Sequence, residues 1–156
     1  VPNDVYCRDA VALGLWSGKW RMIGDMWEEG ERRRLGPIAS VSADDGRITE
    51  VFMLDDNNVF RYDFTSNRWL KEATTRRKIP NTEPCGFIPM NGELYVLRSA
   101  KVRVEASGPW RQLKKKLAME FQVYNPVTKK WRVLTTYPPV GAPIDFRTAA
   151  LCTVEL

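Results

Sequence analysis

The sequence predicts an all-β protein made of a repeated antiparallel unit, and two observations carry this prediction. First, a Tyr-x6-Trp frame occurs twice, as Tyr62-Asp-Phe-Thr-Ser-Asn-Arg-Trp69 and as Tyr124-Asn-Pro-Val-Thr-Lys-Lys-Trp131. In each copy the Tyr closes one alternating apolar run and the Trp opens another, which is typical of two strands joined by a polar turn. Second, a hairpin turn signal precedes each copy, at Asp44-Asp45-Gly46 and at Asn91-Gly92.

Each unit is therefore expected to contain four short strands, which we name a to d in chain order. In the first unit, strand a covers residues 37–42, strand b covers 48–54, strand c ends at Tyr62 and strand d begins at Trp69. In the second unit the same strands cover 85–90 and 93–97, end at Tyr124 and begin at Trp131. Their β-branched and aromatic residues suit a pleated, half-buried sheet.

The repeat also predicts how the whole chain is organised as a single domain. Trp20 lies in a Gly-Lys-Trp-Arg segment that matches the start of strand d, so residues 1–35 are expected to end a preceding unit. Residues 36–72 and 84–135 form the two complete units, and residues 146–156 are expected to begin a further one. The second unit carries an insertion at 99–117, where Pro109 and the spacing of apolar residues predict a short helix over 107–119.

Meandering four-stranded units of this length are the blades of a β-propeller. Tyr62, Trp69, Tyr124 and Trp131 are then packing residues that fill the space between blades, because such rings bury large areas. A propeller has about 4–8 blades, and this chain supplies two with pieces of two more. We expect it to be part of a longer protein, rather than to close a ring from several copies or to leave open sheet edges.

The Tyr-x6-Trp frame after a Gly-turn hairpin resembles the kelch repeat, over residues 35–156 and more weakly before them. The version at Tyr124–Trp131 resembles plant F-box/kelch-repeat proteins. Kelch repeats carry a Gly-Gly pair after strand b, whereas this chain has Asp55-Asp56 and Arg98-Ser99 there, so its b–c connections are expected to differ. F-box-associated domains use a similar Asn-Pro-x-Thr-x-x-Trp phrase, and both β-folds stay open at this point.

The resemblance implies a non-enzymatic module that presents a protein target to an SCF-type ubiquitin ligase. A Skp1-type adaptor would be a partner only through an F-box upstream of this chain. Residues 1–35 lack the leucine-rich helical pattern of an F-box. The ligase role therefore rests on family analogy.

Composition narrows the chemistry that the chain can perform. Histidine is absent, which excludes His-dependent nucleophile systems and His-based metal sites. A carboxylate-only metal site using Asp44, Asp45, Asp55 and Asp56 remains as an enzyme alternative, although Asp is ordinary in hairpin turns. We expect no cofactor and no membrane span, since no apolar run is long enough. Three widely spaced cysteines indicate free thiols and a cytoplasmic or nuclear location.

The connections between strands d and a and between strands b and c are expected at one end of a propeller, where recognition occurs on loops. Basic residues gather in these connections, and with Trp110 they form the predicted partner site. Its members are Arg32, Arg33, Arg34, Arg76, Arg77, Lys78, Trp110, Arg111, Lys114 and Lys115. Guanidinium groups bind carboxylates and phosphates bidentately, so an acidic or phosphorylated protein segment is the predicted target. Nucleic acid is the disfavoured alternative, because 19 acidic residues accompany the 24 basic ones.

Overall fold

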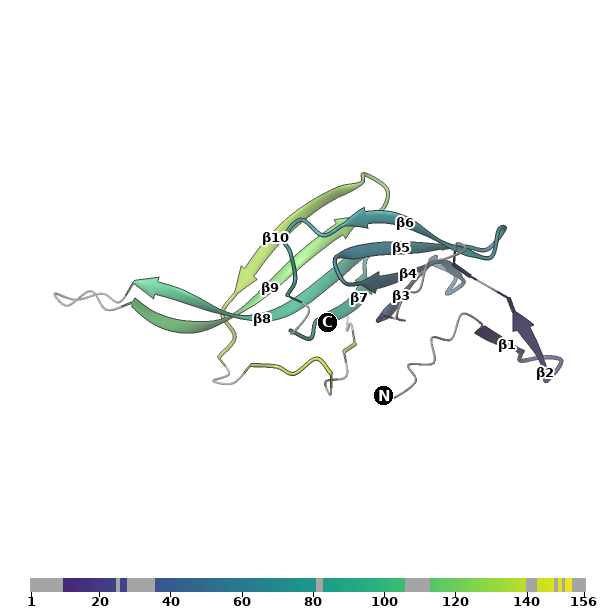
Figure 1. Ribbon diagram of the computed structural model, residues 1–156, viewed down its shortest axis with the longest axis horizontal. Helices are drawn as coiled ribbons and strands as arrows, with labels where there is room; N and C mark the ends of the chain where they lie inside the picture. The colour runs from purple at the N-terminus through teal and green to yellow at the C-terminus, as the bar shows by residue number, and fades with distance from the viewer. Residues whose placement is uncertain are drawn as a thin grey trace, which may run out of the picture.

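Over the residues that it describes, the computed structural model contains ten strands in three antiparallel sheets and no helix (Figure 1). The structure describes residues 10–24, 26–27, 36–80, 83–105, 113–139, 143–147, 149 and 151–152. The strands are β1 Ala10–Gly14, β2 Lys19–Ile23, β3 Ile38–Ser42, β4 Ile48–Asp55, β5 Asn58–Asp63, β6 Arg68–Thr74, β7 Gly86–Met90, β8 Glu93–Glu105, β9 Leu113–Asn125 and β10 Lys130–Thr136. No described helix is long and apolar enough to cross a membrane.

The two larger sheets repeat one pattern, with the order β3-β4-β5-β6 in the first and β7-β8-β9-β10 in the second. Each strand pairs with the next one along the chain, as in a propeller blade. The first strands of the two sheets, β3 and β7, contact each other. This arrangement confirms the predicted four-stranded antiparallel units. We refer to the β3–β6 sheet as the first blade and to the β7–β10 sheet as the second blade.

The repeated Tyr-Trp frame is a repeated turn. Tyr62 stands opposite Trp69 in the β5–β6 register, and Tyr124 stands opposite Trp131 in the β9–β10 register. The ring centroids are 5.2 Å apart in the first pair and 4.9 Å apart in the second. In both turns the residue directly before the second strand has a positive φ, which is 56° at Asn67 and 58° at Lys129. Such a left-handed residue closes a hairpin loop built on a type I turn.

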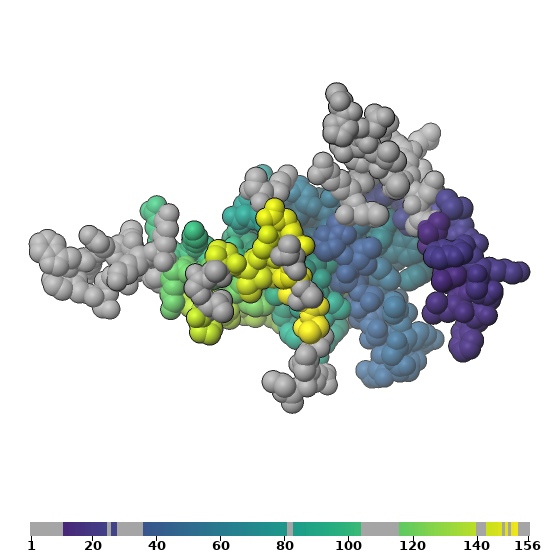
Figure 2. Space-filling model, turned by 90° about the horizontal axis from the view of Figure 1, so that it is seen from below, coloured from purple at the N-terminus to yellow at the C-terminus, as the bar shows by residue number. Residues whose placement is uncertain are grey.

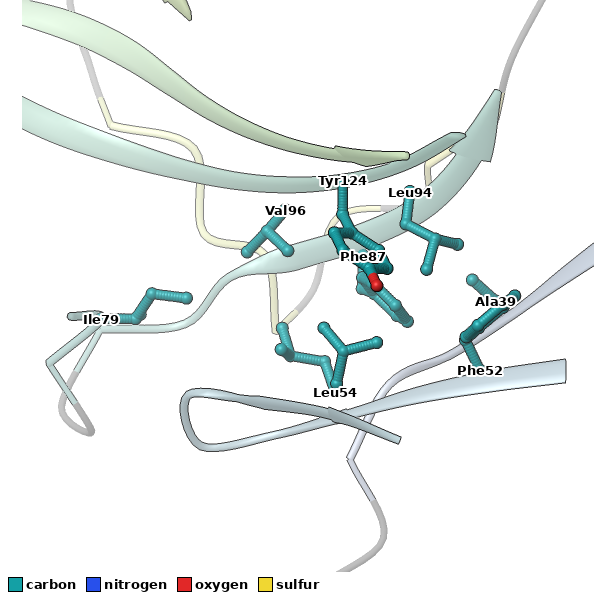
Figure 3. Close-up of a cluster of buried hydrophobic side chains, with 9 residues drawn as sticks. Ala39, Phe52, Leu54, Ile79, Phe87, Leu94, Val96 and Tyr124 are labelled. Carbon is teal, nitrogen blue, oxygen red and sulfur yellow. The ribbon is translucent and has the colours of Figure 1, made fainter. Parts of the chain in front are cut away.

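A core of buried side chains joins the two blades (Figure 3). Alternate residues of β4 and β8 face this interface, since successive strand residues point to opposite faces. The core consists of Ala39, Phe52, Leu54, Val59, Ile79, Phe87, Leu94, Val96 and Tyr124. Tyr124 is only 1% exposed. Burying nine such side chains makes this interface the main hydrophobic contribution to stability.

The outer faces of the two blades are covered by the flanking segments of the chain. Met26 and Trp27 pack on the first blade, where Trp27 stacks on Trp69 with centroids 6.2 Å apart. On the second blade, Phe146 packs against the cluster that contains Tyr95 and Val123. The flanking segments therefore cover part of the outer face of each blade, as the stacking of neighbours on a propeller blade requires.

Strands β1 and β2 form a two-stranded sheet in which Trp20 stands opposite Leu13. The Trp20 side chain is 66% exposed. Trp20 is thus the second residue of its strand, as Trp69 is of β6, but it lacks the packing that covers Trp69. At the other end of the chain, Arg147 lies in a turn, and Ala149, Leu151 and Cys152 lie in no strand. The further blade predicted at 146–156 stays a prediction.

The predicted helix in the insertion is wrong for residues 113–119, which form the start of β9. Their partners in β8 run from Ser99 to Glu105, so the insertion lengthens strands b and c into one hairpin. The apolar spacing did not distinguish a helix from a strand here. Leu113 and Leu117 are four residues apart, which is two full periods of the pleat, so they also lie on one face of a strand. Residues 106–112, which include Pro109, lie outside the described part of the chain.

Candidate recognition surface

The connection from β6 to β7 is held against its own blade by Asn57. Asn57 follows Asp56, whose φ of 55° forms the tight turn between β4 and β5. The Asn57 side-chain oxygen accepts hydrogen bonds from the Ile79 amide at 2.6 Å and the Thr75 hydroxyl at 3.1 Å. The Thr75 amide also donates to the Asn57 carbonyl at 2.8 Å. One asparagine therefore fixes both ends of residues 75–79, which we call the linking loop.

Gln122 holds the linking loop against the second blade. The Arg77 amide donates to Gln122 Oε1 at 2.7 Å, and Gln122 Nε2 donates to the Arg77 carbonyl at 2.9 Å. The Gln122 side chain is fully buried, so these bonds satisfy polar groups that would otherwise be costly to bury. The backbone of Arg77 is thus fixed between the blades, while Arg76 and Lys78 on either side are exposed.

Glu120 draws the side chain of Arg77 into a small ionic cluster. Arg77 lies 2.5 Å from one Glu120 oxygen, and the Arg98 Nε lies 2.8 Å from the other. Arg98 also reaches Glu83 at 3.2 Å. Although burial alone raises the pKa of Glu120, hydrogen bonds from Arg98 and Arg77 outweigh it and hold the pKa below its usual value. The cluster connects the linking loop to the base of the β8–β9 hairpin.

Two adjoining hollows of about 460 and 480 Å³ lie at this end of the blades. They share Glu83, Pro84 and Arg147 as a common wall. The first is bordered by the β4–β5 turn and the linking loop, through Asp56 and Ile79. The second is bordered by the β8–β9 hairpin and the 143–147 segment. Together they make a concave surface that runs from the β4–β5 turn and the linking loop to the root of the β8–β9 hairpin.

The structure treats the predicted partner residues unequally. Arg77 forms an ion pair with Glu120, and its backbone is hydrogen-bonded to Gln122. Arg76 and Lys78 make no ion pair with any residue that the structure describes. Lys114 and Lys115 lie on β9, opposite Val104 and Arg103 in the register. The remaining predicted members, Arg32, Arg33, Arg34, Trp110 and Arg111, lie outside the described residues.

Sequence reasoning missed Asn57, Glu120 and Gln122, which position the linking loop. A signal for two of them was present. Glu120 and Gln122 share the face of β9 that carries buried Ala118 and Tyr124. Polar residues at alternate positions of an otherwise buried strand face indicate that partners come from a neighbouring segment. Asn57 carries no such signal, since Asn is common in any turn.

Carboxylates and cysteines do not gather into a metal centre in the described ranges, where no three acidic or Cys side chains are grouped as metal ligands would be. Asp45 instead accepts a 2.9 Å hydrogen bond from the Arg47 amide within its hairpin turn. Cys85 and Cys152 are free thiols. Burial raises the pKa of the Cys85 thiol, so it is held in its neutral form.

No known family profile matches the chain. A search of characterised proteins finds similarity over the whole chain to the F-box/kelch-repeat protein OR23 of Arabidopsis thaliana, with 38% identity over 160 residues. The chain spans 36% of the length of that relative. The relative carries kelch repeats, and the two four-stranded meanders match the kelch blade. Of the two β-folds that the sequence left open, the kelch propeller is therefore the one present.

Proposed function

Because this chain is a partial kelch-type β-propeller related to F-box/kelch-repeat proteins, we propose that it recognises other proteins and selects targets for an SCF-type ubiquitin ligase. The observation that carries the proposal is the fixed linking loop, whose Ile79 lines the first of the two adjoining hollows. Its backbone is held between the blades by Asn57 and Gln122, while Arg76 and Lys78 are exposed. A rigid loop loses little entropy on binding, which favours recognition.

The basic side chains of the linking loop favour an acidic or phosphorylated target segment. Arg76 and Lys78 offer cationic groups that are not neutralised by ion pairs within the described ranges. Arg77 contributes by holding the loop in place rather than by contacting the target. This is a binding role that needs no cofactor. The free thiols of Cys85 and Cys152 support a location in a reducing compartment, the cytoplasm or the nucleus.

The ligase part of the proposal rests on the name of the relative, and it requires an F-box in the complete protein. A Skp1-type adaptor would bind that F-box, while the propeller binds the target. The adaptor and the target are thus expected to contact different parts of the molecule. Their binding should be separable by mutation.

The test is quantitative affinity purification of the complete protein from plant cells, with and without proteasome inhibition. The R76E/K78E variant should lose a set of co-purifying proteins that accumulate when the proteasome is inhibited. The matched control is K71E/K130E, which makes the same charge change at exposed positions on β6 and β10. The control should retain those proteins.

Two results would contradict the proposal in different ways. Identical co-purifying proteins for all three forms would show that the linking loop is not the target site. Absence of a Skp1-type adaptor from every purification would remove the ligase role and leave only the protein-binding role.

A further inference from the structure

Strands β8 and β9 continue well beyond the strands on either side of them (Figure 1). β7 pairs with β8 only as far as Leu97, and β10 pairs with β9 only from Met119 onward. The β8–β9 register nevertheless continues to Glu105 opposite Leu113. Residues 98–105 and 113–118 therefore form a two-stranded ribbon. Among the described residues no further strand lies along either of its outer edges.

The outer part of the ribbon holds most of the net charge of the protein. Lys101, Arg103, Lys114, Lys115 and Lys116 stand against the single acid Glu105, leaving four of the chain's five net positive charges there. Lys101 and Arg103 are exposed and form no ion pair within the described ranges. Lys101 and Arg103 lie two residues apart on one face of β8, so their like charges repel each other and an acidic partner that neutralises them stabilises the ribbon.

A hollow of about 480 Å³ lies at the root of the ribbon, and Ser99, Ala100, Lys101 and Leu117 line it. Ser99 and Lys101 lie on one face of β8, and Leu117 stands opposite Lys101 in the register, so the hollow lies on that face of the ribbon. Its far wall is the 143–147 segment, which Ser99 fixes by accepting a 3.0 Å hydrogen bond from the Ile144 amide. Figure 2 shows this yellow segment beside the green ribbon.

We propose that the ribbon captures an acidic, extended segment of a partner protein, which adds as a strand along the β8 edge from Ala100 outward. This proposal rests on the proposed role in protein recognition and adds a second contact site to it. An unpaired strand edge is a template for such pairing, and its lysines suppress pairing with another copy of the same edge.

The alternation along β8 specifies the sequence of the partner. Lys101 and Arg103 lie on one face, while Val102 lies on the other. A segment that alternates acidic and apolar residues would therefore place its acids beside Lys101 and Arg103 and its apolar side chains beside Val102. A nucleic acid backbone offers no strand edge to pair with, which favours a peptide.

The test uses the full 156-residue chain and a fluorescein-labelled peptide of about ten alternating Glu and Val residues, the length of an ordinary strand. Fluorescence anisotropy should show binding that weakens by about tenfold or more in K101E/R103E. The matched control K71E/K130E makes the same charge change at exposed positions on β6 and β10 and should bind within about twofold of the unmodified chain. Circular dichroism checks that both variants keep the sheet.

A second peptide separates strand addition from simple charge attraction. N-methylation of alternate residues removes backbone donors and keeps every charge, so this peptide should fail to bind. Equal binding of the two peptides, or equal loss in both double variants, would overturn the proposal. Tighter binding of a single-stranded oligonucleotide than of the peptide, lost in K101E/R103E, would assign the ribbon to nucleic acid instead.

The ribbon proposal and the proposed function fail separately. The peptide assay needs no cellular target, so it can succeed even if R76E/K78E loses no co-purifying protein. Conversely, a target lost in R76E/K78E, combined with no peptide binding, would contradict the ribbon proposal alone.

Discussion

The Tyr124 hydroxyl donates a 2.9 Å hydrogen bond to Glu72, and this bond joins strand β9 of the second blade to strand β6 of the first. Glu72 also accepts from Arg61 of its own blade at 3.4 Å and pairs with Lys129 of the second blade. Burial first, and then the neighbouring Glu72 carboxylate, raise the pKa of Tyr124 well above its usual value. The repeat aromatic is therefore both a packing residue and a polar connection between blades.

Tyr124→Phe is expected to destabilise the protein by about 1–2 kcal/mol, because it removes a hydrogen bond to a charged group and leaves the ring in place. Urea unfolding measures the change. Tyr62→Phe is the matched control, since Tyr62 stands at the same place in the first blade but bonds Asn67 within its own turn. A larger loss in Tyr62→Phe would contradict the assignment of Tyr124 as the link between blades.

Acid is expected to weaken the contact between the blades. Burial raises the pKa of Glu72 and Glu120, but their cationic and hydroxyl partners outweigh it and lower both pKa values in the folded state. A carboxylate with a lowered folded pKa stabilises the fold above its unfolded pKa, and this stabilisation is lost as the pH falls through the folded pKa. Stability should thus be steady near neutral pH and decline below about pH 4.5.

Glu120→Gln should make this acid limb less steep, because position 120 then has no carboxylate to protonate while Glu72 remains. The stability of the variant at neutral pH should be lower, since the Arg77 and Arg98 guanidinium groups lose their counter-charge. Urea unfolding across the pH range compares it with Asp44→Asn, which changes an exposed carboxylate in the turn between β3 and β4. An unchanged acid limb in Glu120→Gln would mean that other groups govern it.

Asn57→Ala is expected to release the linking loop without unfolding the blades. It removes the acceptor for the Ile79 amide, whose 2.6 Å bond should otherwise protect that amide from hydrogen exchange. Exchange of the Ile79 amide should accelerate, while that of β4 and β5 stays slow. Asn58→Ala is the control, because Asn58 accepts only a 3.1 Å bond from the Thr74 hydroxyl. Equal acceleration in both variants would contradict the role given to Asn57.

Gly36→Ala is expected to disrupt the entry to β3. A Cβ at Gly36 would lie 1.7 Å from the Leu54 carbonyl oxygen, which no side-chain movement relieves. The 3.0 Å bond from the Leu54 amide to the Pro37 carbonyl should break with it. Gly24→Ala is the control, since a Cβ there meets nothing within 4 Å. Thermal unfolding should show a clear loss for Gly36→Ala alone, and equal midpoints would show that the close approach is unimportant.

The four-stranded blades follow from local patterns of residues. Strand alternation, the turns at Gly46 and Gly92 and the Tyr-x6-Trp frame are local patterns, and each acts over a few residues. The positive φ values of 78° at Gly46 and 73° at Gly92 fit the turns predicted there. Such features survive in any blade because the backbone geometry of a hairpin depends on its own residues.

Contacts in the folded protein determine which basic residues of the linking loop form ion pairs. Arg76, Arg77 and Lys78 are indistinguishable in sequence, yet only Arg77 is bound by Glu120 and Gln122 from the next blade. Such contacts also determine that residues 113–119 form a strand, because the hydrogen-bond partners offered by residues 99–105 of β8 outweigh the local helical spacing. Contacts between residues far apart in the chain set both outcomes, and no local pattern records them.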